Sequence, residues 1–433
     1  MKNFKLILLT FLSAAFVFGQ TQITLSLDEA LSLIAKNNII IQKSKNNMNI
    51  SNNNVNFANS GLLPRLDFNS SMNYTDALSQ MPGTSGNTQN TSISNGANLS
   101  YTIFNGLKGV NTYRLLKVQA KNVKLQHEIL IENTLYNSSL LFFNLLMSYD
   151  NLNILKEQLD ISKERLKQIR DKNDLGIASQ LQTLAAQVDF DSDSSSVIES
   201  EFLFEDNIRK LNLILGWDLT HKYIPVLDEY DFSTYNLSEL QEQVLQKNKN
   251  LIVNQNLKTK SELDLKMAKG SLLPTISANV NYGLSQTNSD VDFGFDDPNL
   301  SISSGLNFSW NIFDGRGKNN VQNAKSQLRN SELSIIDSER EMINEIESAY
   351  QSFIKSLKIL DLKKNNLNSA QLNFDQTNEL YRLGTVTSTQ FRESQLNLSR
   401  VKNSMSSAKY SAYLGEIKIW LLIGQIENKL LSE

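Results

Sequence analysis

The second half of this chain repeats the first half at a nearly constant offset. Four landmarks occur in the same order in both halves: Leu62-Leu63-Pro64 and Leu272-Leu273-Pro274 (274 − 64 = 210), Ile103-Phe104-Asn105-Gly106 and Ile312-Phe313-Asp314-Gly315 (315 − 106 = 209), Leu175-Gly176 and Leu383-Gly384 (384 − 176 = 208), and Leu215-Gly216 and Ile423-Gly424 (424 − 216 = 208). Self-similarity of this kind predicts two copies of one structural unit. We expect a first repeat at 20–216, a linker or equatorial segment at 217–236, a second repeat at 237–424 and a C-terminal tail at 425–433.

Residues 1–19 have the character of a secretory signal peptide. Lys2 and Lys5 precede a run of apolar or small residues from Leu6 to Phe18. This run has thirteen residues (18 − 6 + 1 = 13), too few to cross roughly 30 Å of hydrocarbon as a helix, so a membrane anchor is the weaker interpretation. We expect cleavage after about residue 19 and export of the chain. No later run approaches the ~18 apolar residues of a transmembrane helix, so any contact with a membrane must be made by strands.

A strand hairpin is expected in each repeat, at about 65–104 and about 275–313. Each follows a Leu-Leu-Pro motif, where the opening helix of the repeat must stop because the residue before proline is pushed out of the helical region. Beyond it, apolar and polar residues alternate with the period of two that is typical of a strand. The apolar series are Leu66, Phe68, Met72 and Tyr74; Ala97, Leu99, Tyr101 and Ile103; Ile276, Ala278, Val280, Tyr282 and Leu284; and Leu306, Phe308, Trp310 and Ile312. We expect polar loops at about 77–93 and 286–301 between the strands of each hairpin.

These strands have one apolar face and one face of Asn, Ser and Thr that is free of charge over most of its length. Their length is near the ~9–11 residues that a tilted strand needs to cross a bilayer. A half-buried sheet in a soluble domain has the same alternation, so the alternation alone leaves both interpretations open. The export signal favours the membrane, as do aromatic residues on the apolar faces, where interfacial girdles form. The aromatic residues that we expect to face lipid are Tyr74, Tyr101, Tyr282 and Trp310.

Helical hairpins are expected at about 107–215 and 316–423. The first, long helix of each lacks proline, and its apolar residues recur every seven positions. These rows are Leu145, Leu152, Leu159 and Leu166 in the first copy, and Ile346, Phe353, Leu360, Leu367, Phe374 and Tyr381 in the second. A repeat of seven predicts left-handed supercoiling against neighbouring helices that cover the row. Each hairpin ends in a tight tip, where Gly176 and Gly384 fit the left-handed conformation that terminates a helix.

The strand count of one chain requires oligomerisation. Four strands cannot close a barrel, and an open edge in lipid leaves unpaired backbone groups that cost several kcal/mol each. Two chains would supply eight strands, whose interior is filled by side chains, and three would supply twelve strands around a wider polar lumen. The predicted fold is therefore mainly α with a membrane β-barrel portion, in which the uncharged face lines a water-filled channel and the long helices continue it as a tube.

The composition argues against an enzyme and against a nucleic-acid binder. Lys and Arg number 42 and Asp and Glu number 45, so the net charge is −3 and not strongly basic. The chain has no cysteine and only two histidines, His127 and His221. Metal clusters, cysteine nucleophiles and HExxH sites are therefore absent from the sequence, and no Walker or dinucleotide glycine pattern occurs. We expect no catalytic residues, no metal and no cofactor.

The whole mature chain resembles the TolC-type outer-membrane efflux proteins. The resemblance rests on the duplication, the two Leu-Leu-Pro motifs, the Phe-Asn-Gly and Phe-Asp-Gly turns, and the Tyr-Arg-Leu-Gly-Thr-Val-Thr tip at 381–387. It implies a homotrimer with one twelve-stranded β-barrel in the outer membrane, continued by an α-helical coiled-coil tunnel in the periplasm. Such a trimer would be the exit duct of a tripartite efflux pump or of a type I secretion system. Its tips would dock a periplasmic adaptor, and an inner-membrane transporter would drive transport.

The resemblance also assigns roles to residues near the tips. The adaptor contacts of the family fall on Leu175, Gly176, Ile177 and Ala178, and on Leu383, Gly384, Thr385 and Val386. In the family's best-known member, acidic residues six and nine positions after the second tip glycine form a constriction, and these positions are Gln390 and Glu393 here. Only the second is acidic, so Glu393 beside Arg392 also fits a solvated helix face. Three aspartates of the first hairpin would add negative potential to a lumen, but surface solvation is the stronger interpretation. They are Asp189, Asp191 and Asp193.

Two other protein classes stay open at this point. The first is a structural or adhesive protein of the cell envelope, a coiled-coil spacer with soluble sheets and no pore. The second and weaker is the adaptor subunit of a pump, which would have one helical hairpin where this chain has a duplicated pair. Both alternatives predict strands that stay soluble without detergent, whereas a duct is extracted from outer membranes as a stable trimer.

Overall fold

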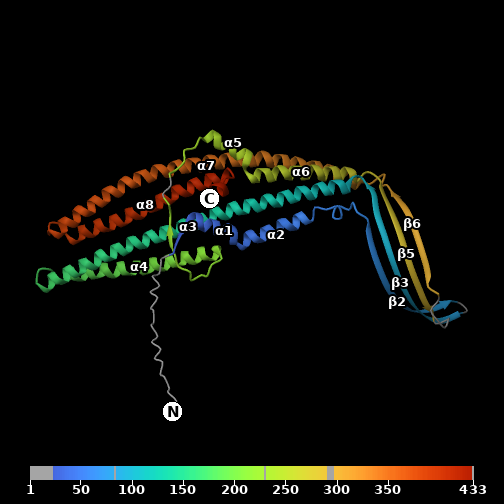
Figure 1. Ribbon diagram of the computed structural model, residues 1–433, viewed down its shortest axis with the longest axis horizontal. Coiled ribbons are helices and arrows are strands. Elements are labelled where there is room, and N and C mark those ends of the chain that lie inside the picture. Colours follow the sequence, from blue (N-terminus) through green and yellow to red (C-terminus); the bar gives the residue numbers. More distant parts are fainter. Residues whose placement is uncertain (1–22, 82–83, 229–230, 290–296, 432–433) are drawn as a thin grey trace, which may run out of the picture.

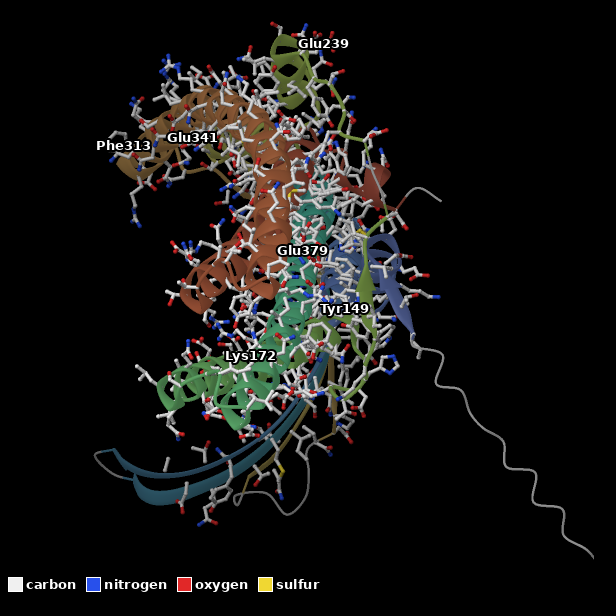
Figure 2. All side chains as sticks on the ribbon, turned by 90° about the vertical axis from the view of Figure 1, so that its left-hand side faces the viewer. Tyr149, Lys172, Glu239, Phe313, Glu341 and Glu379 are labelled. Carbon is white, nitrogen blue, oxygen red and sulfur yellow. The ribbon has the colours of Figure 1, made fainter. Side chains whose placement is uncertain are left out.

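The computed structural model describes residues 23–81, 84–228, 231–289 and 297–431, so the signal peptide predicted at 1–19 lies outside the described residues. The molecule is elongated. A sheet forms one end, and two helical hairpins point away from it at the other end (Figure 1). Seen from the tips of the hairpins, the sheet is a curved band behind the helices (Figure 2).

The same series of elements occurs twice along the chain. The first series is α1 (Leu27–Asn37), α2 (Ile39–Asn53), β2 (Arg65–Met81), β3 (Thr84–Asn105), α3 (Lys108–Asp174) and α4 (Gln180–Leu215). The second series is α5 (Leu237–Lys247), α6 (Lys249–Gly270), β5 (Thr275–Ser289), β6 (Asn299–Ser309), α7 (Gly315–Arg382) and α8 (Ser388–Leu422). Outside these series lie β1 (Thr24–Ser26), β4 (Ile224–Val226) and α9 (Ile426–Leu430). The helices α3 and α7 have 67 and 68 residues, so each proline-free stretch is one continuous helix.

The opening helix of each repeat is divided in two, where the sequence predicts a single helix. Asn38 separates α1 from α2, and its Oδ1 accepts a hydrogen bond from the backbone N–H of Ile40 at 2.9 Å. Asn248 separates α5 from α6 at the equivalent position (248 − 38 = 210), and its Oδ1 accepts from the N–H of Asn250 at 3.0 Å. An asparagine side chain competes with the helical backbone and caps the next helix, which explains the break in both copies.

The two copies differ in how the second of these helices ends. α6 ends at Gly270, directly before Leu272-Leu273-Pro274, as the sequence predicts. α2 ends at Asn53, and residues 54–64 form turns, so the prediction that this helix reaches the first Leu-Leu-Pro is wrong. The reason is again local competition by asparagine, because Asn56 Oδ1 accepts from the N–H of Asn59 at 2.7 Å and its amide donates to the carbonyl of Asn53 at 2.9 Å.

The four long strands form one antiparallel sheet in the order β2–β3–β5–β6. β2 and β3 pair without interruption from Arg65 opposite Ser100 to Met81 opposite Thr84. The loop predicted at about 77–93 is therefore wrong, because residues 77–81 pair with residues 84–88 and residues 89–93 pair with earlier residues of β2. In the second hairpin, part of the loop predicted at 286–301 lies outside the described residues.

The sheet has two chemically different faces. Residues that are directly opposite each other share a face, and Phe68, Ala97, Tyr282 and Ile302 form one apolar row across all four strands. The side chains of this face are exposed, with Phe68 at 73% and Ile302 at 70%. On the other face the adjacent row is Asp67, Asn98, Asn281 and Ser303. Apart from an Arg65–Asp67 ion pair of 2.8 Å, the polar face from Arg65 to Thr75 and across the partner strands carries Asn, Ser, Thr and Gly.

Four helices continue the four strands as a layer, here called the helix layer. α2 leads into β2, α3 follows β3, α6 leads into β5 and α7 follows β6, and neighbours in the sheet are also neighbours in the layer (Figure 1). Thr112 Oγ1 of α3 lies 3.6 Å from Met267 Sδ of α6, and the hydroxyls of Ser261 on α6 and Ser331 on α7 lie 2.8 Å apart. Among the described residues, no helix has both the length and the apolar character needed to cross a membrane.

The hydrophobic core lies at mid-length, where α1, α3, α4, α8 and α9 meet. Phe142 and Phe143 of α3 are fully buried there, and so is Ile426 of α9, so residues expected to form a C-terminal tail are part of the core. The linker predicted at 217–236 also contributes structure, since β4 pairs in parallel with β1. Six members of the rows of apolar residues spaced by seven are buried, namely Leu145, Leu152, Leu166, Ile346, Phe353 and Leu360. The others are half-buried, namely Leu159, Leu367, Phe374 and Tyr381.

Gly106, which joins β3 to α3, permits a close approach of its backbone to the backbone of Gly270. Gly315, its counterpart in the second repeat, has no such neighbour. The φ of Gly106 is +64°, and an added Cβ would lie 2.0 Å from the carbonyl oxygen of Gly270. We predict that Gly106→Ala lowers stability by roughly 3 kcal/mol, because left-handed strain and a backbone clash add. The measurement is the midpoint of thermal unfolding of the detergent-purified protein.

Gly315 is the matched control for this substitution. It occupies the equivalent turn, but an added Cβ meets nothing within 4 Å and its φ is not positive. Gly315→Ala should change stability by less than about 1 kcal/mol. Equal losses in the two variants would show that the Gly106–Gly270 approach is not what makes the first turn sensitive.

Candidate functional site

The tips of the two helical hairpins are built alike. Gly176 and Gly384 have φ of +73° and +78°, so the prediction of a left-handed residue at each helix end is confirmed. The N–H three positions after the end of each helix closes the turn: Ile177 donates to the carbonyl of Lys172 at 2.8 Å, and Thr385 to that of Leu380 at 2.9 Å. The sequence thus ends both hairpins through the same backbone mechanism.

The second helix of each hairpin, α4 or α8, also begins with the same kind of cap, and Gln390 is part of the cap of α8. Ser179 and Gln182 cap α4 reciprocally, and Thr387 and Gln390 cap α8 in the same way at an offset of 208 (390 − 182 = 208). Gln390 Oε1 accepts from the N–H of Thr387 at 2.8 Å. The carboxamide of this predicted constriction residue is therefore engaged in a capping box.

The two tips are braced by different chemistry at equivalent positions. In the second hairpin the rings of Tyr381 and Phe391 stack at 4.7 Å between centroids. In the first hairpin the residues 208 positions earlier are Asn173 and Thr183, and the amide of Asn173 donates to the hydroxyl of Thr183 at 3.3 Å. The second tip is therefore braced by an aromatic stack, and the first tip is braced by a part-buried hydrogen bond.

The predicted adaptor-contact residues lie at the surface of the tips. Leu175, Ile177 and Leu383 are exposed by 74%, 72% and 74%. Ala178 is half-buried against the apolar cluster of the first hairpin. Gly176, Gly384 and Thr385 are exposed and Val386 is half-buried. Each tip therefore presents apolar side chains on a turn that is rigid, which is a surface suited to contact with another protein.

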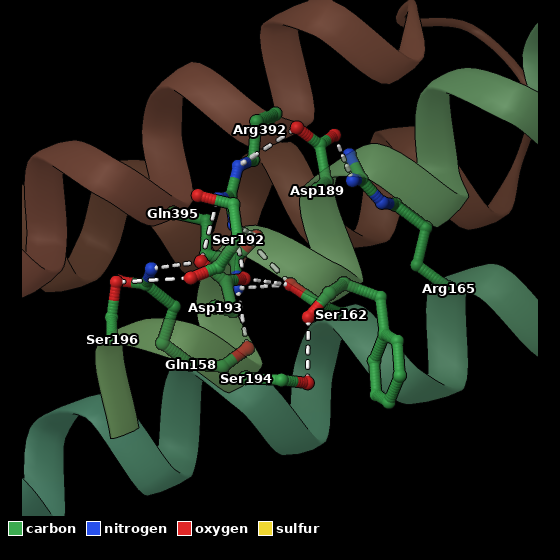
Figure 3. A network of polar contacts seen from close by, with 11 residues as sticks. Gln158, Ser162, Arg165, Asp189, Ser192, Asp193, Ser194, Ser196, Arg392 and Gln395 are labelled. Carbon is green, nitrogen blue, oxygen red and sulfur yellow. Dashed lines mark hydrogen bonds and ion pairs between the residues drawn. The ribbon is translucent and has the colours of Figure 1, made fainter. Parts of the chain in front are cut away.

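Arg392 and Asp193 form a buried ion pair between the two hairpins (Figure 3). Both terminal nitrogens of the Arg392 guanidinium donate to the Asp193 carboxylate at 2.7 Å. Asp193 is 2% exposed, so the prediction that this aspartate is solvated is wrong. Glu393, by contrast, is exposed on the next position of α8, and the described residues include no ion-pair partner for it. On α8, Arg392 thus points into the protein and Glu393 is exposed to solvent.

Further polar side chains complete this network from α3 and α8. Gln158 donates to Asp193 at 2.6 Å, Ser162 also donates to it, and Gln395 donates to the backbone carbonyl of Gln158 at 2.9 Å. Arg165 pairs with Asp189, which lies one turn before Asp193 on α4. Every charge in the network has an opposite charge beside it, which is the condition for burying charges at tolerable cost.

The ionisation of Asp193 follows from these contacts. Burial alone raises the pKa of its carboxyl, but hydrogen bonds from Arg392, Ser162 and Gln158 outweigh burial, so the pKa lies below its ordinary value of 3.8. Asp193 therefore stays charged at neutral pH. The network fastens the first-repeat hairpin to α8 of the second repeat.

Sequence reasoning missed this network because its central ion pair joins Asp193 and Arg392, which are 199 residues apart in the chain (392 − 193 = 199). A local signal was present. Gln158, Ser162 and Arg165 recur at helical spacing on one face of α3, and Asp189 and Asp193 do so on α4. Polar residues at the spacing of a buried row indicate an interior polar contact, although they cannot name the partner helix.

Three of the four predicted lipid-facing aromatics share the apolar face of the sheet. Tyr74, Tyr101 and Tyr282 are exposed by 62%, 40% and 49% on that face. Trp310 follows the end of β6, so its expected place within the strand is wrong, and its indole N–H donates to the carbonyl of Leu272 at 3.1 Å. In the part of the chain that the structure describes, no group of three or more His, Asp or Glu is placed to hold a metal ion.

Comparison with known proteins identifies relatives. The sequence profile of the family described as outer membrane efflux protein matches residues 30–216 and, a second time, residues 240–425. Over 393 residues the chain is 20% identical to outer membrane protein TolC of Escherichia coli (strain K12), a match that covers 87% of this chain and 77% of TolC.

Solved structures of low sequence identity share the fold. The Campylobacter jejuni CmeC outer membrane channel is similar with a TM-score of 0.77 and 20% identity, covering 92% of this chain and 86% of that chain. The open state of the Neisseria gonorrhoeae MtrE outer membrane channel is similar with a TM-score of 0.72 and 12% identity, covering 92% of this chain and 89% of that chain.

We predict that Arg392→Gln destabilises the protein by about 3–5 kcal/mol, because it leaves the Asp193 carboxylate buried without its cation. Arg400→Gln is the matched control, since Arg400 is exposed on the same helix and no ion pair of it occurs among the described residues. Its effect should stay within about 0.5 kcal/mol. Thermal unfolding in detergent measures both. Similar midpoints for the two variants would contradict a structural role of the network.

The buried Asp193 carboxylate should also make the stability of the folded protein sensitive to acid. Its pKa is lower in the folded than in the unfolded chain, so the stabilisation is complete above the ordinary value of 3.8 and is lost as the pH falls through the folded value. The unfolding midpoint should therefore drop below about pH 4, and this drop should shrink in Asp193→Asn. Asp160→Asn, an exposed acid of α3, should keep the wild-type pH profile. An unchanged acid response in Asp193→Asn would refute the assignment.

Proposed function

The chain belongs to the outer membrane efflux protein family, and from this membership we propose that it is the exit duct of a tripartite efflux pump or of a type I secretion system. Family membership indicates an outer-membrane location and a channel, not an enzyme. The finer proposal concerns how copies assemble, which surfaces meet partners, and what passes through. The duct would pass small molecules or polypeptides from a periplasmic adaptor and an inner-membrane transporter to the outside.

The observation that carries this proposal is a two-faced sheet with open outer strands. One face exposes large apolar side chains, including Phe68 at 73% and Leu306 at 76%, and the other carries Asn, Ser and Thr. β2 and β6 each have one neighbour among the described strands, so their outer edges have free backbone groups. In lipid such groups must be paired, and strands of further copies are the partners that preserve both faces.

Three copies are favoured over two. Four strands per chain give eight strands in a dimer, a barrel whose interior side chains fill, and twelve in a trimer, a barrel with a wider polar lumen. The apolar face then meets lipid, with Tyr74, Tyr101, Tyr282 and Trp310 near its boundaries, as in an aromatic girdle. The uncharged polar face lines the water-filled lumen.

The helical part of the trimer continues this lumen into the periplasm as a coiled-coil tunnel. α3 and α7 are about 100 Å long at 1.5 Å per residue, several times the thickness of the hydrocarbon core. The repeats at 20–216 and 237–424 then supply equivalent helical hairpins around the wall. The sequence has no Walker pattern for ATP, and in this proposal an inner-membrane transporter supplies the energy.

The hairpin tips are proposed to meet the periplasmic adaptor. Their contact residues are Leu175, Gly176, Ile177, Ala178, Leu383, Gly384, Thr385 and Val386. Support comes from exposed apolar side chains on turns fixed by left-handed glycines. Near the second tip, Glu393 projects from α8 while Arg392 points into the inter-hairpin network, so three copies of Glu393 form the acidic part of a constriction with Gln390 beside it.

Single-channel recording tests this proposal. Protein purified in detergent as a trimer should give discrete openings in a planar bilayer. Glu393→Gln should reduce cation preference, because a ring of carboxylates concentrates cations at a narrow point. Asp375→Asn is the matched control, since it removes an exposed acid of the same hairpin outside the proposed constriction, and its selectivity should stay that of the wild type.

The opposing outcomes are distinct. A protein that stays monomeric and soluble without detergent, and that gives no current, would refute the duct and favour a coiled-coil spacer of the envelope. A conducting trimer in which Glu393→Gln and Asp375→Asn have the same ion selectivity would support the duct but show that Glu393 is not part of the constriction.

A further inference from the structure

The helices of the helix layer carry a concentration of positive charge next to the sheet. Residues 108–127 of α3 include five Lys or Arg and no acid, and residues 315–331 of α7 include four and no acid. The whole chain has a net charge of −3, so the charge is strongly segregated along the molecule. A cluster of this kind attracts an anionic partner.

On α3 four of the five cations occupy one face and amides occupy the opposite face, where the fifth cation, Lys108, lies three turns before Gln119. The exposed cations recur at steps of three or four: Arg114, Lys117, Lys121 and Lys124. Half a turn away lie Gln119, Asn122 and Gln126. Steps of three and four keep side chains on one side of a helix, so these are two separate surfaces.

The second repeat has the same division. At an offset of 208, Lys117 corresponds to Lys325 and Lys121 to Arg329, while Gln119 corresponds to Gln327 on the amide face (327 − 119 = 208). Lys318 lies two turns before Lys325 on the same face of α7. The duplication therefore places the cationic faces of α3 and α7 on the same side of the helix layer.

α6, between these helices, adds cations to that side. Lys258 of α6 lies 3.6 Å from Glu332 of α7, which Arg329 also pairs with, so the α6 face that includes Lys258 adjoins the cationic face of α7. Lys266 and Lys269 follow within the next turns toward the sheet. Met267, which contacts Thr112 of α3, lies half a turn around α6 from Lys258, so the cations of α6 are not on its α3-facing side. We call the following set the basic face: Arg114, Lys117, Lys121, Lys266, Lys269, Lys318 and Lys325.

The basic face lacks internal neutralisation. No ion pair of any of its members occurs among the described residues, and each is exposed. Lys117 Nζ lies 4.5 Å above the ring of Tyr113, which orients the side chain but leaves its charge. Uncompensated cations repel one another, so an external anion would stabilise this surface.

Four members lie close to the end of the sheet. Lys318 is three residues after the start of α7, Lys269 is one residue before the end of α6, and Lys266 is one turn further. Arg114 is six residues after the start of α3, about 9 Å at 1.5 Å per residue. These distances are comparable to the Debye length of about 8 Å at physiological ionic strength, the range over which a charged surface acts.

We propose that the basic face binds the anionic headgroups of the phospholipid leaflet that surrounds the helix end of the sheet. This inference rests on the proposed function, in which the sheet crosses the membrane. The amide face of the helices, on which Lys108 and Arg316 are cations next to the sheet, has fewer cations than the opposite face and continues the polar face of the sheet toward the lumen. The basic face therefore lies on the outside, below the apolar face of the sheet, where the headgroups are.

Lipid selectivity measured by electron spin resonance tests this inference. The full-length protein is reconstituted in phosphatidylcholine vesicles with a trace of spin-labelled phosphatidylglycerol or spin-labelled phosphatidylcholine. The wild type should hold phosphatidylglycerol at the protein surface more strongly, with a preference on the order of fivefold that falls at high salt. A variant with Arg114, Lys266, Lys269 and Lys318 all changed to Gln should lose it.

A control variant removes the same amount of charge far from the sheet. It changes four exposed lysines of α3 and α7 to Gln: Lys163, Lys167, Lys355 and Lys358. This variant should keep the lipid preference. Loss of the preference in both variants would mean that net charge alone decides it and would overturn the inference.

Other results separate this inference from the proposed function. Channel currents without any preference for phosphatidylglycerol would overturn the basic face as a lipid site and leave the duct intact. A changed anion selectivity in the Arg114, Lys266, Lys269 and Lys318 variant, with an unchanged lipid preference, would place these cations in the lumen and also overturn it. Failure of the wild type to insert in vesicles would overturn both proposals.

Discussion

The open edges of the sheet are the constraint on which the rest of the structure depends. β2 and β6 have a partner on one side only among the described strands, and the face they share exposes large apolar residues. Neither water nor lipid accepts both features at once, because water disfavours the apolar face and hydrocarbon leaves the edge groups unpaired. The assembly with further copies proposed above would resolve the conflict. The helix layer then inherits the curvature and order of the strands, since each helix continues one strand of the sheet.

Buried polar contacts decide how the two repeats sit against each other. The hydroxyl of Tyr410 in the second repeat donates to the Asp150 carboxylate in the first at 2.8 Å, and Lys249 Nζ of the second repeat lies 3.1 Å from Glu132 Oε1 of the first. Nearer the tips, Arg392 of the second repeat pairs with Asp193 of the first. Apolar rows alone allow helices to slide past one another, whereas directional contacts between buried polar groups select one register. The two hairpins are thereby held as one body at the level where the tunnel is proposed to narrow.

Much of the fold could be predicted from local patterns. Leu145 and Phe353 are buried in equivalent rows, as the spacing of seven predicts, and Gly176 and Gly384 end the long helices with positive φ. Polar segments were harder, because Ser, Asn and Thr are typical of loops and of the wet face of a sheet alike. Residues 77–81 and 84–93 are strand because they pair in a backbone ladder, and residue type does not encode that pairing. The turns at the tips follow from the same local patterns, whereas the roles of the tip residues come from the family resemblance.

The sequence by itself determined the duplication, the lengths of α3 and α7, the turns at the tips and the two faces of the sheet. Each of these depends on residues that are near one another in the chain, where spacing and conformational preference are sufficient. Only the tertiary structure decided that Asp193 is buried against Arg392, that Asn38 and Asn248 divide the opening helices, and that cations of α3, α6 and α7 share one surface. These features depend on which helices become neighbours. Burial and pairing energies belong to the packed molecule, and a side chain such as Asp193 has the same identity in the sequence whether it is solvated or enclosed.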